Sequence, residues 1–135
     1  MGVMFWVKLY LATIPVFFAI DMLWLGVLAR SFYQTNLRHL LSPEVNWPAA
    51  LVFYLIYIAG ILLFAVRPGL EVQSLARACL WGALFGFFTY ATYDLTNLAT
   101  LRDWPLNVVL VDIAWGTVLC TLVAGGSYLA ALKLA

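Results

Sequence analysis

The chain has 135 residues, of which 66% are hydrophobic and only 10% are charged, and its formal net charge is +1. A soluble domain is roughly half apolar and a quarter charged, so this composition excludes a soluble fold. The nearly neutral charge gives no basis for binding nucleic acid. We therefore expect the main partner of the protein to be the lipid bilayer.

Four apolar segments follow one another along the chain, near residues 4–29, 48–66, 75–101 and 106–132. A helix needs about 20 apolar residues to cross the hydrocarbon core of a bilayer. The segments therefore predict an all-α fold, an integral membrane four-helix bundle that forms a single domain over residues 1–135. A stretch near residues 31–41 is amphipathic, which predicts a short helix lying in the membrane interface.

The basic residues weakly indicate how the protein is oriented. With four alternating helices, one side of the membrane carries Lys8, Arg67, Arg77 and Lys133. The other side carries Arg30, Arg38 and Arg102. Because cytoplasmic loops are enriched in lysine and arginine, this small excess favours both termini in the cytoplasm.

A similarity between the two halves of the chain suggests a duplication. The second segment opens with "NWP" at Asn46 and the fourth with "DWP" at Asp103, and each reads as a polar cap followed by proline in the first helical turn. The first and third segments each carry a late aspartate. Two duplicated helical hairpins would explain these features, and so would convergent chemistry at the membrane interface.

Three aspartates lie inside the apolar segments: Asp21, Asp94 and Asp112. Each is seven or eight residues from the same side of the membrane, which corresponds to a depth of roughly 10 Å. A carboxylate at this depth costs a few kcal/mol and must face protein or water. The spacing of Asp21 and Trp24 is repeated by Asp112 and Trp115. The three carboxylates are therefore predicted to share one polar region.

Polar and aromatic residues near these aspartates share their helix faces. We predict a binding pocket formed by Asp21, Trp24, Tyr90, Tyr93, Asp94, Asn97, Asn107, Asp112 and Trp115. Three arginines near the same surface are predicted charge partners: Arg30, Arg38 and Arg102. We expect Arg30 or Arg102 to lie in salt-bridge reach of an aspartate, directly or through water. The structural alternative is that the aspartates accept hydrogen bonds from tryptophan and tyrosine and thereby lock the helices together.

Known cofactor motifs are missing from the sequence. It contains no phosphate-binding loop, no dinucleotide-binding glycines and no metal-ligand spacing, so we predict neither a cofactor nor a metal. The two cysteines, Cys79 and Cys120, form no C-x-x-C motif, which disfavours a thiol–disulfide relay. No catalytic residue can be assigned from these patterns.

Several stretches resemble a family of small bacterial membrane proteins, catalogued as domain-of-unknown-function family 2177. They are "FFAIDMLWLG", "FYLIYIAGILLFAV", "YATYDLTNLATLRDWP" and "DIAWGTVL". The resemblance covers nearly the whole chain, and "YDLTNLATLRDWP" is its most specific element. It implies a multi-pass protein of the bacterial inner membrane with four helices, and it implies no particular activity.

Three functions remain open at this point. The first is binding or transport of a proton, a cation or a small polar molecule at the intramembrane aspartates, with a homodimer as one arrangement. The second is an enzyme that modifies a lipid or isoprenoid, with Asp94 and Asp112 as acid and base. The third is an accessory subunit of a larger membrane complex. A pocket open to one side of the membrane favours the first function, and a slot open toward lipid favours the second.

Overall fold

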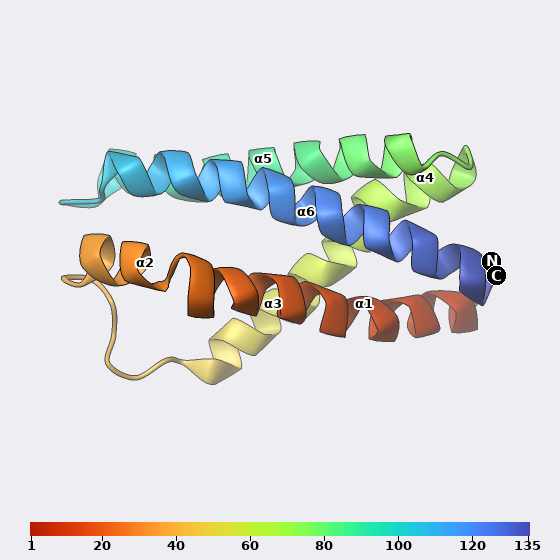
Figure 1. Ribbon diagram of the computed structural model, residues 1–135, viewed down its shortest axis with the longest axis horizontal. Coiled ribbons are helices and arrows are strands. Elements are labelled where there is room, and N and C mark those ends of the chain that lie inside the picture. Colours follow the sequence, from red (N-terminus) through yellow and green to blue (C-terminus); the bar gives the residue numbers. More distant parts are fainter.

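The computed structural model describes residues 1–135 and consists of helices without any strand, which confirms the predicted all-α class (Figure 1). In chain order the elements are α1 (Val3–Leu23), the π-helical turn η1 (Trp24–Leu28), α2 (Arg30–Leu37), α3 (Trp47–Ile61), the π-helical turn η2 (Leu62–Val66), α4 (Arg67–Glu71), α5 (Leu75–Thr100) and α6 (Leu106–Leu134). The boundaries of the long helices agree with the sequence prediction to within a few residues.

Three helical runs are long and apolar enough to cross a membrane: Val3–Leu28, Trp47–Glu71 and Leu106–Leu134. They correspond to the segments predicted near residues 4–29, 48–66 and 106–132. Helix α5 has 26 residues, a sufficient length, but its composition does not meet the same standard because its C-terminal half is polar. The structure therefore supports three membrane-spanning candidates by length and composition.

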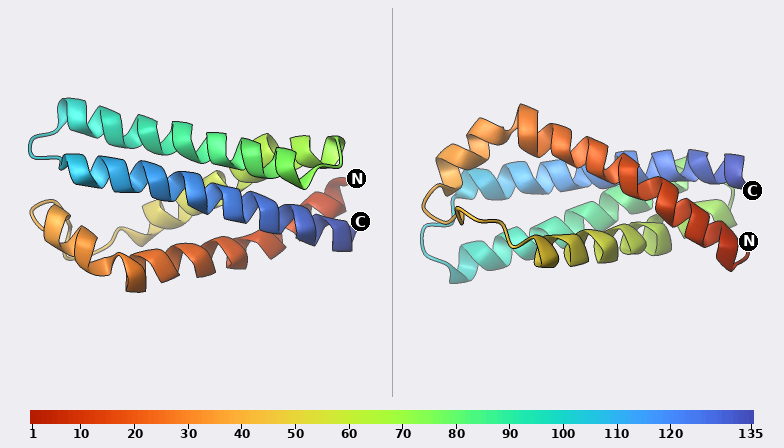
Figure 2. Two further views of the ribbon diagram at one scale, coloured as in Figure 1. Left: turned by 45° about the horizontal axis from the view of Figure 1, so that its top comes forward. Right: turned by 90° about the horizontal axis from the view of Figure 1, so that it is seen from below.

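Helix α6 is the central element of the fold. It packs antiparallel against α5 along its length in the most extensive helix contact of the molecule, and α1 lies against another of its faces. The run from α3 to α4 crosses the other helices diagonally (Figures 1 and 2). Both termini lie at one end of the molecule, and α2 and the α5–α6 turn lie at the other end (Figure 2).

A compact apolar core connects α1, the α3–η2 run and α6. Its largest fully buried side chains include Leu9, Phe17, Ile58, Ile61, Leu119 and Val123. One polar contact lies among them, because the hydroxyls of Thr13 and Ser127 are 2.6 Å apart and join α1 to α6. Burial of a satisfied hydroxyl pair is inexpensive in a membrane helix interface.

The first and second long helices each end in a π-helical turn. The Ala29 N–H donates to the Trp24 carbonyl, and the Arg67 N–H donates to the Leu62 carbonyl, five residues back in both cases. Turns of this type are rare and often lie at functional sites. The turn η1 begins three residues after Asp21 and leads directly into α2.

The two helix starts that suggested a duplication differ in the structure. Asn46 is a true cap of α3, since its Oδ1 accepts a hydrogen bond from the Ala49 N–H at 3.2 Å. Asp103 caps nothing: it has a φ of 58°, a left-handed conformation that aspartate tolerates, and α6 begins after Pro105. The predicted equivalence of these helix starts was wrong, because Asp103 belongs to the short turn between α5 and α6. The duplication itself stays a prediction.

The predicted interfacial helix near residues 31–41 is the shorter helix α2, Arg30–Leu37. It lies over the end of the bundle, where Leu37 is buried. The Asn107 side chain donates to Asn36 Oδ1 at 2.7 Å and ties α2 to the first turn of α6. Through this contact α2 covers the region in which the three aspartates lie.

Candidate functional site

A cavity of about 580 Å³ lies among α1, α3, α5 and α6 below helix α2. Ligand pockets in proteins commonly have volumes of about 300–1,000 Å³. The lining residues are Asp21, Leu25, Tyr33, Leu37, Phe53, Tyr54, Tyr57, Thr89, Tyr90, Tyr93, Trp104, Asp112 and Trp115. The cavity thus combines two carboxylates with a mainly aromatic wall.

Asp21 has both carboxylate oxygens engaged by partners from other helices. Trp115 Nε1 of α6 donates to Oδ1 at 3.3 Å, and the Tyr54 hydroxyl of α3 donates to Oδ2 at 3.1 Å. The side chain is only 5% exposed. Asp21 therefore joins three helices, as an aspartate with a structural role would.

Asp112 on α6 accepts a hydrogen bond from a residue of α2. The Tyr33 hydroxyl donates a hydrogen bond to Asp112 Oδ1, and Trp24 Nε1 donates to the Tyr33 hydroxyl at 3.1 Å. The Trp24 and Trp115 rings stack with centroids 4.4 Å apart. Burial and then the hydrogen bond to Asp112 raise the pKa of Tyr33, so the phenol keeps its proton and remains a donor. The second oxygen of Asp112, Oδ2, accepts no hydrogen bond within the chain.

Asp94 has the least common environment of the three aspartates. Its side chain is 0% exposed, and neither carboxyl oxygen has a hydrogen-bond partner. Asp112 and the indole of Trp104 lie beside it, but the buried Trp104 Nε1 also makes no hydrogen bond. A buried polar group without a partner costs about 1–3 kcal/mol, and such groups cluster where proteins perform a function.

No basic residue neutralises the three aspartates. The only ion pair in the structure joins Arg67 and Glu71, whose side chains are more than half exposed. Arg30, Arg38 and Arg102 are exposed and form no ion pair, so no arginine pairs directly with an aspartate, and a pairing through water stays a prediction. Arg30 opens α2, Arg38 follows it, and Arg102 lies in the turn after α5. The aspartates lie inside the bundle, where Asp21 and Asp112 accept hydrogen bonds from uncharged tyrosine and tryptophan.

The cavity opens toward the side of the molecule. Leu37 is buried above the cavity, and Tyr33 and Trp104 are partly buried around it, so the end of the bundle is covered. In contrast, three lining residues on the long helical runs are exposed: Leu25 by 39%, Phe53 by 48% and Tyr93 by 55%. Phe53 is six residues into α3 and Tyr93 is seven residues before the end of α5, so each lies about 10 Å along its helix. The opening therefore lies along the sides of the helices, about 10 Å from their covered ends.

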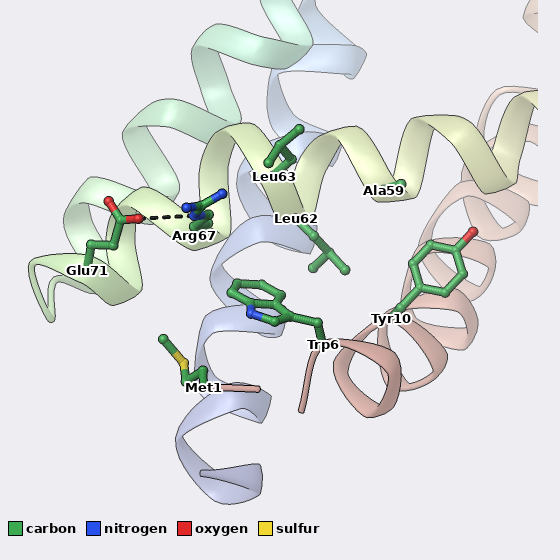
Figure 3. A pocket seen from close by; sticks show the side chains of 8 residues that line it. All are labelled: Met1, Trp6, Tyr10, Ala59, Leu62, Leu63, Arg67 and Glu71. Carbon is green, nitrogen blue, oxygen red and sulfur yellow. Dashed lines mark hydrogen bonds and ion pairs between the residues drawn. The ribbon is translucent and has the colours of Figure 1, made fainter. Parts of the chain in front are cut away.

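A second cavity of about 590 Å³ lies near the chain termini, between α1 and the run of α3, η2 and α4 (Figure 3). Trp6 and Leu62 lie on its wall, and six of its eight lining residues are hydrophobic. Its charged residues are the exposed pair Arg67 and Glu71, and exposed pairs contribute little energy. This cavity has no buried polar group, so the carboxylate cavity is the candidate site.

The nine residues of the predicted pocket take three kinds of position relative to the cavity. Five of them line the cavity: Asp21, Tyr90, Tyr93, Asp112 and Trp115. Trp24 and Asp94 lie directly behind that wall, against Trp115 and Asp112 respectively. Asn97 and Asn107 do not line the cavity, and Asn107 binds Asn36 instead.

The sequence analysis missed three tyrosines that line the cavity. Tyr33 and Tyr54 donate to the aspartates, and the Tyr57 hydroxyl lies 2.7 Å from Thr89 Oγ1 and 3.2 Å from Cys120 Sγ. A tyrosine hydroxyl in an apolar helix needs a polar partner. That requirement was the available signal, but it does not identify the partner.

Replacing Tyr33 with phenylalanine should lower the free energy of unfolding by about 1–2 kcal/mol, because one change removes the donor to Asp112 and the acceptor for Trp24. Unfolding in mixed detergent micelles, followed by circular dichroism, measures this loss. The matched control is Tyr10→Phe, which removes an exposed hydrogen bond to the Leu55 carbonyl and should cost about 0.6 kcal/mol. Equal losses in the two variants would contradict the role of Tyr33.

The helices and the buried carboxylates together define an integral membrane protein with an acidic interior. The profile of one family matches residues 6–129, and the chain belongs to this family, which is described as "Predicted membrane protein (DUF2177)". The family resemblance of the sequence is thereby confirmed. No curated protein and no solved structure matches the chain.

Proposed function

We propose that this protein binds a proton, a cation or a small polar molecule at the carboxylate cavity and carries it across the membrane. The observation that supports this function most strongly is the pair of Asp94 and Asp112. The two carboxyl groups lie beside each other inside the bundle, without any basic partner, and three of their four oxygens accept no hydrogen bond within the chain. Two neighbouring carboxyl groups favour holding one positive charge between them, either a proton or a cation.

The membrane arrangement in this proposal has four crossings, with α5 as the fourth. The close antiparallel packing of α5 against α6 supports it, because a spanning partner can cover the polar face of α5. Both termini then lie on the cytoplasmic side of a bacterial inner membrane. The position of both termini at the same end of the molecule supports an even number of crossings (Figure 1).

A flux measurement tests the proposed transport. The purified protein is reconstituted into liposomes that contain the pH-sensitive dye pyranine, and a potassium gradient with valinomycin imposes a membrane potential. We expect proton entry well above the rate of protein-free liposomes, and we expect Asp112→Asn to reduce it to that rate. Asp103→Asn is the control, because Asp103 is an exposed acid outside the cavity. Equal rates for the wild type and Asp112→Asn would contradict proton transport at this site.

The sideways opening of the cavity favours a second candidate, an enzyme that acts on a lipid or isoprenoid. Asp94 and Asp112 would serve as acid and base, and Tyr93 at the opening would position the substrate. Incubation of the purified protein with bacterial lipid extract, followed by mass spectrometry, tests this candidate. A lipid product that forms with the wild type and not with Asp112→Asn would favour the enzyme over the transporter.

A further inference from the structure

We propose that the ligand of the carboxylate cavity is a lipophilic organic monocation that enters from the bilayer. This inference rests on the proposed function and names the class of its ligand. Four features of the cavity carry it: the sign of its charge, the aromatic character of its wall, its size and the direction of its opening.

The charge of the cavity selects a cation. Asp21 and Asp112 line it, and no lysine, arginine or histidine does. Asp21 has both oxygens engaged by Trp115 and Tyr54, so it is a fixed part of the wall. Asp112 Oδ2 accepts no hydrogen bond within the chain, and Asp94 lies directly behind it. An anionic head group would face two carboxylates without a compensating donor of positive charge, so the site rejects it.

The wall of the cavity selects an organic cation over a metal ion. Eight of the 13 lining residues are aromatic: five tyrosines, two tryptophans and Phe53. The faces of tyrosine and tryptophan attract ammonium-type cations, and this attraction increases when the site is desolvated. A hard metal ion instead requires about six oxygen ligands at short distance, whereas this wall offers two carboxylates among rings. A volume of about 580 Å³ fits a molecule of drug size.

The opening of the cavity selects a lipophilic molecule. Phe53 on α3 and Tyr93 on α5 are about half exposed at the side, whereas α2 and Trp104 cover the end. A ligand that dissolves in the hydrocarbon can reach the cavity through this side without crossing the covered end. A strongly hydrated ion is disfavoured on this path, because it would have to lose its water in the hydrocarbon before it meets a carboxylate.

A pair of probes with the same shape and opposite charges tests this assignment. Tetraphenylphosphonium and tetraphenylborate are titrated into the purified full-length protein in non-ionic detergent, and isothermal titration calorimetry measures binding after subtraction of empty-micelle heats. We expect the cation to bind at one site per chain, with the affinity of the anion at least about tenfold lower. Equal affinities for the two ions would overturn the proposal.

Three variants locate the binding site. Asp112→Asn should weaken tetraphenylphosphonium binding at least about tenfold, and Tyr93→Leu should weaken it more than Tyr93→Phe, which keeps the aromatic ring. Asp103→Asn is the control for a general effect of surface charge, and it should bind as the wild type does. Cation binding that is insensitive to Asp112→Asn would overturn the assignment of the site. If cation binding fails while the proton flux still depends on Asp112, the ligand class is wrong and the proposed function stands; if neither cation binding nor proton flux depends on Asp112, the proposed function is overturned as well.

Discussion

Replacing Gly86 with alanine should lower the free energy of unfolding by about 3 kcal/mol, the largest stability loss we expect from a single methyl group in this protein. A Cβ atom at Gly86 would lie 2.1 Å from the Gly116 carbonyl oxygen and 2.7 Å from its carbonyl carbon. Backbone atoms cannot rotate away as a side chain can, so α5 and α6 would have to move apart. That movement would loosen the most extensive helix contact of the molecule.

A glycine outside this contact provides the control. A Cβ at Gly26 would meet nothing within 4 Å, so Gly26→Ala should leave stability unchanged or raise it slightly, since alanine is the better helix former. Both variants are unfolded in mixed detergent micelles and compared by their midpoints. If Gly86→Ala unfolds at the midpoint of the wild type, the close approach of α5 and α6 is not as described.

Replacing Asp94 with asparagine should remove the proton flux while the protein remains as stable as the wild type or becomes more stable. The asparagine side chain has nearly the same shape as that of Asp94 but cannot hold a proton or a negative charge. Its amide group can donate a hydrogen bond to the neighbouring Asp112, as a protonated Asp94 carboxyl can, so the contact between the two side chains is kept. Flux into pyranine-loaded liposomes and thermal unfolding in detergent measure the two effects separately.

The same substitution at Asp21 should have the opposite effect on stability. Both oxygens of Asp21 accept hydrogen bonds, from Trp115 and Tyr54, and asparagine offers only one acceptor. One buried donor would lose its partner, so Asp21→Asn should cost about 1–3 kcal/mol. A loss of stability in Asp94→Asn, together with unchanged flux, would show that Asp94 has a structural role and no role in transport.

The helical class of the fold was predictable because its cause is local. Unbroken apolar segments of about 20 residues must form helices in hydrocarbon, where the backbone has to satisfy its own hydrogen bonds. The end of α5 and the start of α6 were predictable as well, because the polar "RDW" stretch and Pro105 interrupt the apolar pattern. The same counting of residues placed Asp21, Asp94 and Asp112 at a common membrane depth, which stays a prediction.

The contacts within the site were not predictable, because they depend on how each helix rotates and crosses its neighbours. Counting residues from a turn gives the depth of Asp112 but not its partner, and Tyr33 reaches it from α2. No arginine pairs directly with an aspartate for a related reason: nearness along the sequence to one membrane surface does not bring Arg102 into contact with a buried carboxylate. The diagonal path of α3, which brings Tyr54 to Asp21, has no signature in the sequence pattern.

The π-helical turn between α1 and α2 constrains the length of the chain in this stretch. It contains one residue more than an α-helical turn, as the hydrogen bond from the Ala29 N–H to the Trp24 carbonyl records. Deletion of one residue within Leu25–Leu28 would restore α-helical spacing and rotate α2 by about 100° about its axis. That rotation would carry Tyr33 away from Asp112, although neither residue would itself be replaced. Natural variants of this stretch should therefore vary in residue type more freely than in length.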